Sequence, residues 1–514
     1  MASNGGRGAA RAILRAAAGR LREGVSDRAR AARGLLPRGR HIALTWSIPD
    51  GYGGMTAALL ARTRAFVRHG DVRVDVLTLD EQSDYPAREA ELRRRGEIVE
   101  GMRVLNLWDW LRDNPLPGGS LRLDKHPFSP LLTEPAENVT ELRRGDAVLS
   151  RTLRSDDGER VLQTDHYRLD GSLLASDRRG TDGGGRSIVL CDENGAPVRS
   201  WGRIWHLYAA WLDRLTARRP TFLIVDSKTV APFVGEYRRP HVTTVHLVHA
   251  SHLVGTERPV GRLRESRRRV FENLSAFDAV AVLSERQRAD VEALLGPQEN
   301  LIVVRNVRES GTPGATQTPD GSRAVTAGVM LASLEKRKRV SHAIRAVVAQ
   351  RALAATGSGR PVMLDVYGEG PRRPVLEAVV DRLEAHDAVH LRGFDPHARG
   401  RLVDASFLLL TSTSEGFPLV LAEALAVGCL PIVYDVPYGP ADIIRSGWNG
   451  YVVPAGDVDA MAAAIEELVS LPAERIATMR RNAVLSARPF DPVAVTRAWA
   501  RDLRAARRRS RRRA

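Results

Sequence analysis

Residues 411–440, TSTSEGFPLVLAEALAVGCLPIVYDVPYGP, decide the fold of this chain. An apolar strand-like run, FLLL, comes just before this stretch, and a second one, PIVYD, lies inside it. Between them, a Gly-Phe-Pro turn opens an apolar segment that has the character of a helix. The pattern predicts a strand–turn–helix–strand unit. Such a unit places ligands at the carboxyl end of its first strand, facing the start of the helix.

The residues of this turn indicate an anionic ligand. Pro418 suits the first helical position, where its missing N–H is not needed. The backbone N–H groups of Phe417 and Leu419 then point out of the helix start, where a phosphate accepts hydrogen bonds from them. Glu415 and Glu423 lie on either side of the turn. In this interpretation both face a cleft, one towards a sugar and the other towards a ribose diol. The alternative is an ordinary crossover helix with Glu423 on its solvated face.

The motif EGFPLVLAE, followed by the spacing G-x-x-P-x-x-Y-D, resembles the Glu-x7-Glu region of retaining nucleotide-sugar glycosyltransferases. Those enzymes have two Rossmann-like domains, the GT-B type. The continuation YDVPYGPADIIRSGWNGYVV is similar to the branch that α-glycosylates bacterial poly(polyol-phosphate) teichoic acids and serine-rich adhesins. The resemblance covers most of the chain from about residue 41 to 505. It implies that Glu415 contacts the donor sugar near the anomeric centre and that Glu423 holds the ribose of the nucleotide.

The composition is that of a globular protein with an excess of basic residues. The 514 residues allow about three domains, and 43% hydrophobic with 27% charged residues is ordinary for a folded protein. The net charge of +16 creates a positive field that favours anionic partners. Nucleic acid is not expected as a partner, because aromatic residues make up only 5% of the chain and no recognition motif is visible.

Cysteine usage and the apolar runs predict a cytoplasmic protein. Cys191 and Cys429 lie far apart, and they form neither a disulfide framework nor a metal-ligand spacing, which fits a reducing compartment. No apolar run reaches the roughly 18–20 residues that span a bilayer, and the basic N-terminus lacks the apolar segment of a signal peptide. The basic ends of the chain leave open a peripheral contact with the inner membrane surface.

A Rossmann-like domain interrupted by a β-rich insertion is predicted for the first part of the chain. Residues 1–40 form a basic tail, expected to be flexible; an amphipathic helix on an anionic membrane is the alternative. Residues 41–99 and 206–308 alternate strand and helix patterns. Residues 100–205 contain short strands separated by the hairpin pairs DG and NG. In the resembling branch an insertion at this place mediates self-association or acceptor contact. A β-meander without a role is the alternative here.

A second Rossmann-like domain, for the nucleotide sugar, is predicted over residues 323–488. It follows residues 309–322, which are rich in Gly, Pro, Ser and Thr and have the composition of a linker. Residues 489–505 form a terminal helix, which in folds of this type crosses back to brace the first domain. Residues 506–514 are a like-charge run, expected to be a disordered basic tail. The predicted fold class is α/β, with two Rossmann-like domains of the GT-B type and a β-rich insertion in the first.

Basic residues are expected to stabilise the leaving group. Breaking a sugar–diphosphate bond builds negative charge on the phosphates, so an enzyme without a metal ion needs fixed cations and N–H dipoles there. No metal-ligand cluster is apparent, so we expect no cofactor beyond the UDP-sugar substrate. The resemblance places an arginine, and a lysine five positions later, at the diphosphate. It makes Lys338 the lysine and puts Ser333 at the arginine position.

Ser333 is a departure from the resembling family. A hydroxyl cannot replace a bidentate guanidinium, and losing one charge-assisted contact costs ~1.5–3 kcal/mol. Arg337 or Arg339 can compensate from a neighbouring position; otherwise the site binds a donor weakly or not at all. A solvated basic loop without a role in binding is the remaining alternative.

The histidines that follow a predicted strand near residue 246 are further candidates. An HSxH-like segment of the resembling family reaches the donor-sugar region, and HASH at residues 249–252 is similar to it. We expect His249 near the anomeric centre, with His252 as the second choice. A satisfied structural role is the alternative for both. Asp435, Tyr438 and Gly439 are expected to line the cleft without assigned chemistry, although Asp435 also suits a helix N-cap.

Two glycine-containing turns complete the candidate site. Gly53 and Gly54 stand between a predicted strand and a helix, where the backbone can approach a ligand closely. In the resembling family this loop lies near the donor phosphates and the acceptor. Gly368, Glu369 and Gly370 end another strand and form either the uridine-side wall or a plain strand-to-helix turn.

We therefore expect a retaining α-glycosyltransferase that moves glucose or N-acetylglucosamine from a UDP donor to a hydroxyl of an anionic polyol-phosphate polymer. One alternative changes the acceptor to a serine-rich protein. Another is a catalytically inactive, glycosyltransferase-like subunit that binds acceptor chains, which Ser333 favours and the two glutamates oppose. The expected partners are the UDP-sugar, an anionic polymer or protein acceptor, and further copies of the chain bound through the insertion.

Overall fold

The computed structural model describes residues 34–81, 84–116, 120–121, 128–131, 137–180, 185–255, 257–308, 323–357 and 360–513. The chain divides into two compact units. The first contains residues up to 56, residues 66–245 and residues from 503 onwards; the second contains residues 57–65 and 246–502. The predicted linker, 309–322, lies outside the described residues, as do residues 1–33 of the predicted N-terminal tail.

A seven-stranded sheet has the order β13-β12-β11-β10-β1-β2-β3. Its strands are β1 (Arg40–Leu44), β2 (Val74–Thr78), β3 (Met102–Asn106), β10 (Thr221–Val225), β11 (Val242–Leu247), β12 (Ala279–Val282) and β13 (Leu301–Val303). Every residue of β2, β10 and β11 is buried, as expected for strands covered on both faces. The intervening helices are α2 (Gly54–Gly70), α3 (Tyr85–Arg94), α4 (Leu107–Asp113), α5 (Ile204–Thr216), α6 (Ala231–Glu236), α7 (Glu265–Phe271), η1 (Leu274–Ala276) and α8 (Glu285–Leu295).

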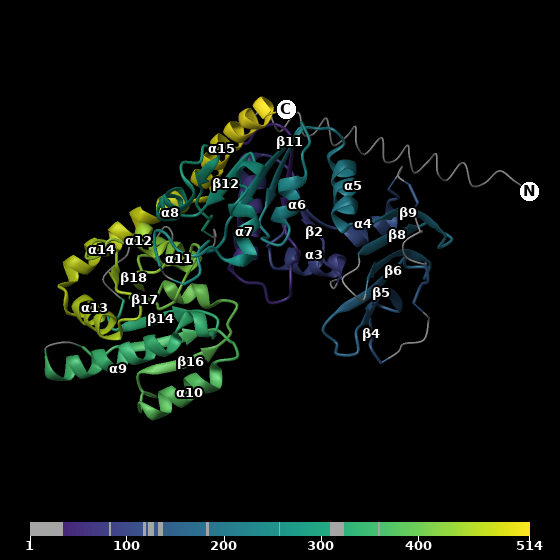
Figure 1. Cartoon of the computed structure of the whole chain (residues 1–514). Helices are drawn as coiled ribbons and strands as arrows, with labels where there is room; N and C mark the ends of the chain where they lie inside the picture. Colours follow the sequence, from purple (N-terminus) through teal and green to yellow (C-terminus); the bar gives the residue numbers. More distant parts are fainter. Residues whose placement is uncertain are drawn as a thin grey trace, which may run out of the picture. The chain divides into compact units, whose positions relative to one another are not determined.

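A separate antiparallel sheet forms the β-rich insertion (Figure 1). Its six strands follow chain order: β4 (Val139–Arg144), β5 (Ala147–Arg154), β6 (Val161–Tyr167), β7 (Leu173–Arg179), β8 (Arg186–Cys191) and β9 (Pro197–Trp201). The expected insertion, 100–205, begins too early, because β3 lies inside that range and pairs in parallel with β2 of the seven-stranded sheet.

The C-terminal sheet has the order β16-β15-β14-β17-β18-β19, and all its neighbouring strands run parallel. The strands are β14 (Ala327–Leu331), β15 (Met363–Tyr367), β16 (Val389–Gly393), β17 (Phe407–Leu410), β18 (Leu430–Tyr434) and β19 (Tyr451–Val453). Their connections include η2 (Lys336–Lys338), α9 (Val340–Thr356), α10 (Arg373–Arg382), η3 (Ala398–Leu402), α11 (Leu419–Ala426) and α12 (Pro440–Ile443). The order reverses between β14 and β17, and in open parallel sheets ligands bind outside the carboxyl ends of the strands at such a point.

The chain closes with α13 (Val458–Ser470), α14 (Ala473–Ala487), η4 (Arg488–Phe490) and α15 (Pro492–Arg513) (Figure 1). The prediction of a disordered tail over 506–514 is therefore wrong up to Arg513. Alanine and arginine favour helix, and Leu503, Ala506 and Ser510 are buried along one side of α15. Among the described residues, no helix is both long enough and apolar enough to cross a membrane.

Candidate functional site

Two loops meet at the carboxyl ends of β14 and β17. The first runs from Ser333 through η2, and the second leads from Thr411 to α11. The hydroxyl of Thr411 lies 2.9 Å from the carbonyl oxygen of Lys338, to which it donates a hydrogen bond. The backbone N–H of Thr413 donates to the carbonyl of Arg337 over 2.8 Å. The basic loop is therefore held against the second loop, while Lys336 and Arg337 remain exposed.

Lys338 and Glu415 form the centre of this arrangement. Lys338 Nζ lies 2.6 Å from Glu415 Oε1, and the two side chains are only 18% and 10% exposed. Arg337 adds a second cation, with its Nη1 3.4 Å from the same oxygen and 3.0 Å from the carbonyl oxygen of Ser414. The loop of Glu415 is fixed by backbone bonds: its N–H donates to Pro437 and its carbonyl accepts from Tyr438, both over 2.8 Å.

Glu423 lies on α11 with its side chain 3% exposed. The alternative that placed it on a solvated helix face is therefore wrong. Arg399, from η3, forms an ion pair with it, with 3.4 Å between Arg399 Nε and Glu423 Oε1. Burial of a carboxylate is costly unless a cation accompanies it, so Arg399 is a functional candidate that sequence reasoning missed. No spacing in the sequence links Arg399 to the glutamate motif.

Helix α11 begins one residue later than predicted. Pro418 is the N-cap, with φ −73° and ψ 104°, and Leu419 is the first helical residue. The expectation that Pro418 occupies the first helical position is wrong, because its ψ is that of an extended residue.

Phe417 is 8% exposed and packs against Phe490, with 5.1 Å between the ring centroids.

Gly416 brings the predicted histidine segment beside Glu415. A Cβ built on Gly416 would lie 1.8 Å from the carbonyl oxygen of His249 and 3.0 Å from Cα of Ala250. Only glycine allows this close approach of the two backbones. The carbonyl of Ala250 also accepts a hydrogen bond from Gln287 Nε2, over 3.1 Å. Gln287 is buried on α8 and holds the segment in place, a role that its sequence position did not indicate.

His252 lies in a buried cluster rather than in an open site. Its ring stacks on Phe271 and Tyr438, with centroid distances of 5.2 Å and 5.8 Å, and it is fully buried. Burial lowers the pKa of His252 to about 4, so the imidazole is neutral. Neither ring nitrogen of His252 has a hydrogen-bond partner among the described residues, so the satisfied structural role is not shown for it either.

Tyr438 joins this cluster to an ion pair. Its hydroxyl donates to Asp290 Oδ2 over 2.7 Å, and Asp290 Oδ1 accepts from Arg258 Nη2 over 2.9 Å. Burial, and then the hydrogen bond to Asp290, raise the pKa of Tyr438. This network ties residues 435–440 to α8, and neither Asp290 nor Arg258 was a candidate from the sequence.

Asp435 pairs with α8 as well. Its Oδ1 lies 2.6 Å from Arg286 Nη1, and the backbone N–H of Arg286 donates to Asp442. The alternative role of Asp435 as a helix N-cap is wrong, because the next helix, α12, begins at Pro440 after Gly439.

The predicted glycine turns have different surroundings. A Cβ on Gly368 would lie 1.9 Å from the carbonyl oxygen of Ala332, and one on Gly370 would lie 2.7 Å from that of Leu334. These two glycines therefore pack against the backbone of Ala332 and Leu334, the residues on either side of Ser333. Glu369 forms an exposed ion pair with Arg373 over 2.6 Å. Gly53, in contrast, has no atom within 4 Å of a Cβ built on it, and the same holds for Gly54.

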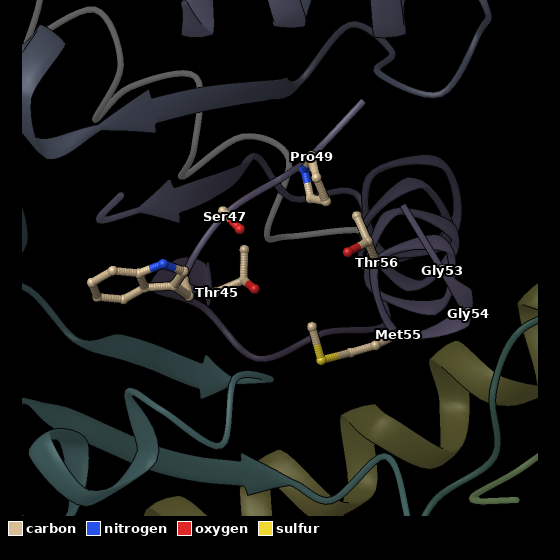
Figure 2. Close-up of a pocket in the computed structure, with 8 residues that line it drawn as sticks. Thr45, Ser47, Pro49, Gly53, Gly54, Met55 and Thr56 are labelled. Carbon is tan, nitrogen blue, oxygen red and sulfur yellow. The ribbon is translucent and has the colours of Figure 1, made fainter. Parts of the chain in front are cut away.

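Gly53 and Gly54 line a pocket in the first unit, at the start of α2 (Figure 2). Its volume is about 360 Å³. The other lining residues are Thr45, Trp46, Ser47, Pro49, Met55 and Thr56. Three hydroxyl groups and two exposed apolar side chains thus surround the glycine turn.

Within the part of the chain that the structure describes, no group of three or more His, Cys, Asp or Glu side chains is placed to hold a metal ion. His246 is buried and lies against Phe277, with 5.6 Å between the ring centroids.

Residues 327–485, which include both loops and the glutamate motif, match the family described as glycosyl transferases group 1. The chain carries a group 1 glycosyl transferase domain. The match confirms that EGFPLVLAE lies in a glycosyl transferase domain, as predicted.

Three curated relatives extend the likeness beyond the group 1 domain. The poly(ribitol-phosphate) alpha-N-acetylglucosaminyltransferase of Staphylococcus aureus is 22% identical over 81% of this chain and 90% of that protein. The poly(glycerol-phosphate) alpha-glucosyltransferase of Bacillus subtilis is 24% identical over 50% of this chain and 37% of that protein. An exopolysaccharide phosphotransferase of Streptomyces coelicolor is 36% identical over 38% of this chain, but the match spans only 20% of that protein.

Solved structures confirm the fold around the group 1 domain. The crystal structure of TarM aligns with a TM-score of 0.68, at 19% identity, over 91% of this chain and 99% of that one. The pneumococcal O-GlcNAc transferase GtfA, in complex with UDP and GlcNAc, aligns with a TM-score of 0.64, at 18% identity, over 91% and 99%. The predicted fold class, two Rossmann-like domains of the GT-B type with a β-rich insertion, is confirmed.

Proposed function

We propose that the protein is a retaining α-glycosyltransferase that transfers glucose or N-acetylglucosamine from a UDP-sugar to a hydroxyl of a polyol-phosphate polymer. The observation that carries this proposal is the contact of Lys338 and Arg337 with Glu415 at the point where the sheet order reverses. This arrangement brings two cations and a carboxylate to the edge where parallel sheets bind nucleotides. The names of the relatives from Staphylococcus aureus and Bacillus subtilis support the acceptor class.

Each residue of this cluster has a proposed role. Lys338 and Arg337 stabilise the charge that builds on the leaving diphosphate. Glu415 contacts the sugar, Glu423 accepts hydrogen bonds from the ribose diol, and His249 lies near the anomeric carbon. Phe417, Leu419, Ser333 and the turn Gly368–Gly370 belong to the donor side. Because Arg337 lies next to Glu415, we propose that it compensates for the arginine that Ser333 replaces.

The proposed reaction exchanges one C–O bond for another. The bond between the anomeric carbon and the β-phosphate oxygen breaks, and its electron pair leaves with UDP. The acceptor oxygen bonds to the same face of the anomeric carbon, so the α configuration is retained. The acceptor proton passes to the departing phosphate oxygen. Fixed cations offset the phosphate charge, and we propose that no metal ion is required; activity then persists in excess EDTA.

An acceptor screen tests the proposal. Purified protein is incubated with UDP-glucose or UDP-N-acetylglucosamine, and UDP release is measured without acceptor and with poly(glycerol phosphate), poly(ribitol phosphate) or a serine-rich peptide. We expect release to increase with a polyol-phosphate chain, and NMR of the product to show an α linkage. Stimulation by the peptide alone would favour the protein-acceptor alternative, which the likeness to an O-GlcNAc transferase supports. Folded protein that releases no UDP under any condition would favour the inactive binding subunit.

We also propose a cytoplasmic enzyme that associates with the inner membrane surface and assembles through the antiparallel sheet β4–β9. Exposed arginines at residues 497, 508, 511 and 512 of α15 support the membrane contact, since clustered basic side chains attract anionic lipids. Cell fractionation at low and high salt tests the location, because electrostatic attachment is released by salt. Size-exclusion chromatography with light scattering, before and after deletion of residues 137–201, tests the assembly.

A further inference from the structure

Helix α7 carries an arginine whose charge no described residue neutralises. Arg267 is only 9% exposed and lies on the buried side of the helix, together with Val270 and Phe271. Its guanidinium forms no hydrogen bond or ion pair with the described residues. Burial, and then the nearby Arg264, lower the pKa of Arg267 to about 10, so the side chain is still charged at neutral pH. A buried charge without a partner is unfavourable, which makes Arg267 a candidate for binding an anion.

The acidic side chains close to α7 have other partners. Glu265 and Glu272, at the two ends of the helix, pair with Arg268 over 3.1 Å and 3.9 Å. Asp290 pairs with Arg258. Among the described residues, no carboxylate contributes to the pKa of Arg267. The charge of Arg267 is therefore not part of an internal ion pair of this region.

A ligand can reach the charged end of Arg267. None of its nitrogen atoms is among the unpartnered polar atoms that are closed off from solvent, so the small exposed part of the side chain includes the guanidinium. Arg264 is half-buried, and its side chain also has no partner among the described residues. Two neighbouring cations repel each other, and an anion that binds both removes this repulsion.

The arginine pair lies close to the loop of Glu415. The backbone N–H of Arg264 donates to the carbonyl of His252 over 2.9 Å, which fixes the start of α7 to the histidine segment. The His252 ring stacks on α7 and on Tyr438, and the N–H of Tyr438 donates to the carbonyl of Glu415 over 2.8 Å. His252 and Tyr438 thus connect α7 to the loop that carries the proposed sugar contact.

The chemistry of the proposed acceptor matches this position. In a polyol-phosphate chain, each free hydroxyl lies only a few bonds from a phosphodiester, so a hydroxyl that reaches the sugar brings a negative charge with it. Arginine binds such a group through two parallel N–H···O bonds. The donor diphosphate has Lys338 and Arg337 as its proposed cations. The acceptor phosphate is the remaining anion of the reaction, and Arg267 is a cation without a partner.

We propose that Arg267, supported by Arg264, binds a phosphodiester of the acceptor polymer near the loop of Glu415. This inference rests on the proposed function, which provides a polyol-phosphate acceptor. The bound phosphate positions the neighbouring hydroxyl of the chain. The site therefore selects phosphate-containing chains over uncharged polyols, which gain nothing from a buried guanidinium.

Direct binding tests the role of Arg267 without turnover. Isothermal titration calorimetry measures the affinity of oligomeric poly(glycerol phosphate) for wild type, Arg267→Met and Arg267→Lys. We expect the affinity to fall about 10- to 100-fold in Arg267→Met, because hydrogen bonds to a charged group are lost, and to fall less in Arg267→Lys, which keeps the charge. Arg268→Met is the matched control, because it removes the same charge from an exposed position of α7. Equal losses in Arg267→Met and Arg268→Met would attribute binding to net charge and overturn the inference.

Thermal unfolding separates a ligand site from a structural role. Without ligand, Arg267→Met is expected to unfold at the temperature of wild type or above it, because the change removes an unpaired buried charge. Saturating oligomer is expected to raise the unfolding temperature of wild type more than that of the variant. Affinities are compared at a temperature at which every variant is folded. A folded Arg267→Met variant with wild-type affinity would overturn the inference.

Titration with UDP separates the acceptor from the donor. We expect wild type and Arg267→Met to bind UDP equally, and weaker binding of UDP to the variant would assign Arg267 to the donor and overturn the inference. Arg267-dependent binding of the oligomer without any UDP-sugar turnover would support the phosphate site and refute the proposed function. Acceptor-stimulated turnover with an oligomer affinity that does not depend on Arg267 would do the reverse.

Discussion

Lys338 Nζ lies 2.6 Å from Glu415 Oε1, although 77 positions separate the two residues in the chain. The contact joins the loop after β14 to the loop after β17, and it lies within the residues that match the glycosyl transferase family. A cation and a carboxylate are thereby held at the switch point of a parallel sheet. In the proposed function, the diphosphate and the sugar of the donor each contact one partner of this pair.

Replacing Lys338 tests its role at the diphosphate. Lys338→Gln is expected to lower kcat/KM for the UDP-sugar by roughly 100- to 1000-fold, as loss of one fixed donor at a developing charge does in other enzymes. UDP release is the measurement. Lys336→Gln provides the control, because Lys336 is exposed in the same short helix. Equal losses in the two variants would contradict a specific role for Lys338.

Arg337 and Ser333 are expected to be coupled. Arg337→Gln is expected to raise KM for the UDP-sugar about 10-fold, in line with the loss of one charge-assisted contact. Ser333→Arg returns the guanidinium to the position that the family uses, and it is expected to restore most of that loss in the double variant. Kinetics of the two single variants and the double variant measure the coupling energy. Additive effects would show that Arg337 does not compensate for Ser333.

A methyl group at Gly416 is expected to separate the two backbones that meet there. Gly416→Ala places Cβ on the carbonyl of His249, so residues 249–250 must move. We expect a stability loss of about 1–3 kcal/mol together with a large loss of activity. Thermal unfolding and UDP release are measured in parallel. Gly202→Ala is the control, because the nearest atom to its added Cβ is 3.9 Å away.

The hydroxyl of Tyr438 is expected to stabilise the fold through Asp290. Tyr438→Phe removes a 2.7 Å hydrogen bond to Asp290 but keeps the ring stacked on His252. The free energy of unfolding is expected to fall by about 1.5–3 kcal/mol, since the acceptor is charged. Urea denaturation measures the loss. Tyr451→Phe is the control, because it removes a tyrosine hydrogen bond to Glu467 elsewhere in the same unit. Its loss of stability is the reference for the loss in Tyr438→Phe. A Tyr438→Phe variant as stable as wild type would exclude this role.

Buried His252 is expected to make the protein sensitive to acid. Its pKa is about 4 in the folded protein, mainly through burial, against 6.5 ordinarily. Between pH 6.5 and pH 4, His252 binds a proton more readily in the unfolded chain than in the folded protein. The stability that neutral His252 permits is therefore complete above pH 6.5 and is lost as the pH falls towards 4. The total is roughly 3 kcal/mol. His41, whose pKa burial also lowers to about 4, acts in the same direction.

His252→Phe tests this contribution, because phenylalanine keeps an aromatic ring between Phe271 and Tyr438 but does not titrate. The free energy of unfolding, measured in urea from pH 7 to pH 4, is expected to fall less steeply in the variant than in wild type. The exposed His397→Gln is the control. Identical slopes for wild type and His252→Phe would show that the burial of His252 does not carry the acid sensitivity.

The elements of the candidate site follow from local patterns. FLLL and PIVYD predicted β17 and β18, since buried parallel strands are continuous apolar runs. The predicted start of the helix between them is one residue early. Proline has nearly the same φ at an N-cap as at the first helical position, so only the ψ of Pro418 distinguishes the two. The prediction of a disordered tail over residues 506–514 fails because only Ala506 and Ser510 reveal its buried side, and arginines surround them in the sequence.

Partners between distant elements could not be predicted. Arg399 beside Glu423, Gln287 at Ala250 and Asp290 at Tyr438 come from elements that share no periodicity or spacing with the residues they contact. The sequence made His249 a candidate for the site, but it did not predict that the backbone of His249 lies against Gly416. The pocket around Thr45 was missed except for its two glycines, because the lining of a pocket is visible only once the chain is folded.

Periodicity and short motifs were enough to predict most strands and helices, the glycosyl transferase domain and the charged candidates for the site, because each of these depends on residues within a short segment. The tertiary structure alone decided that Lys338 and Arg337 contact Glu415, that Glu423 is buried beside Arg399, and that His252 is neutral. The physical reason is that ion pairing, burial and desolvation depend on distances in space, which the parallel pairing of β14 with β17 sets.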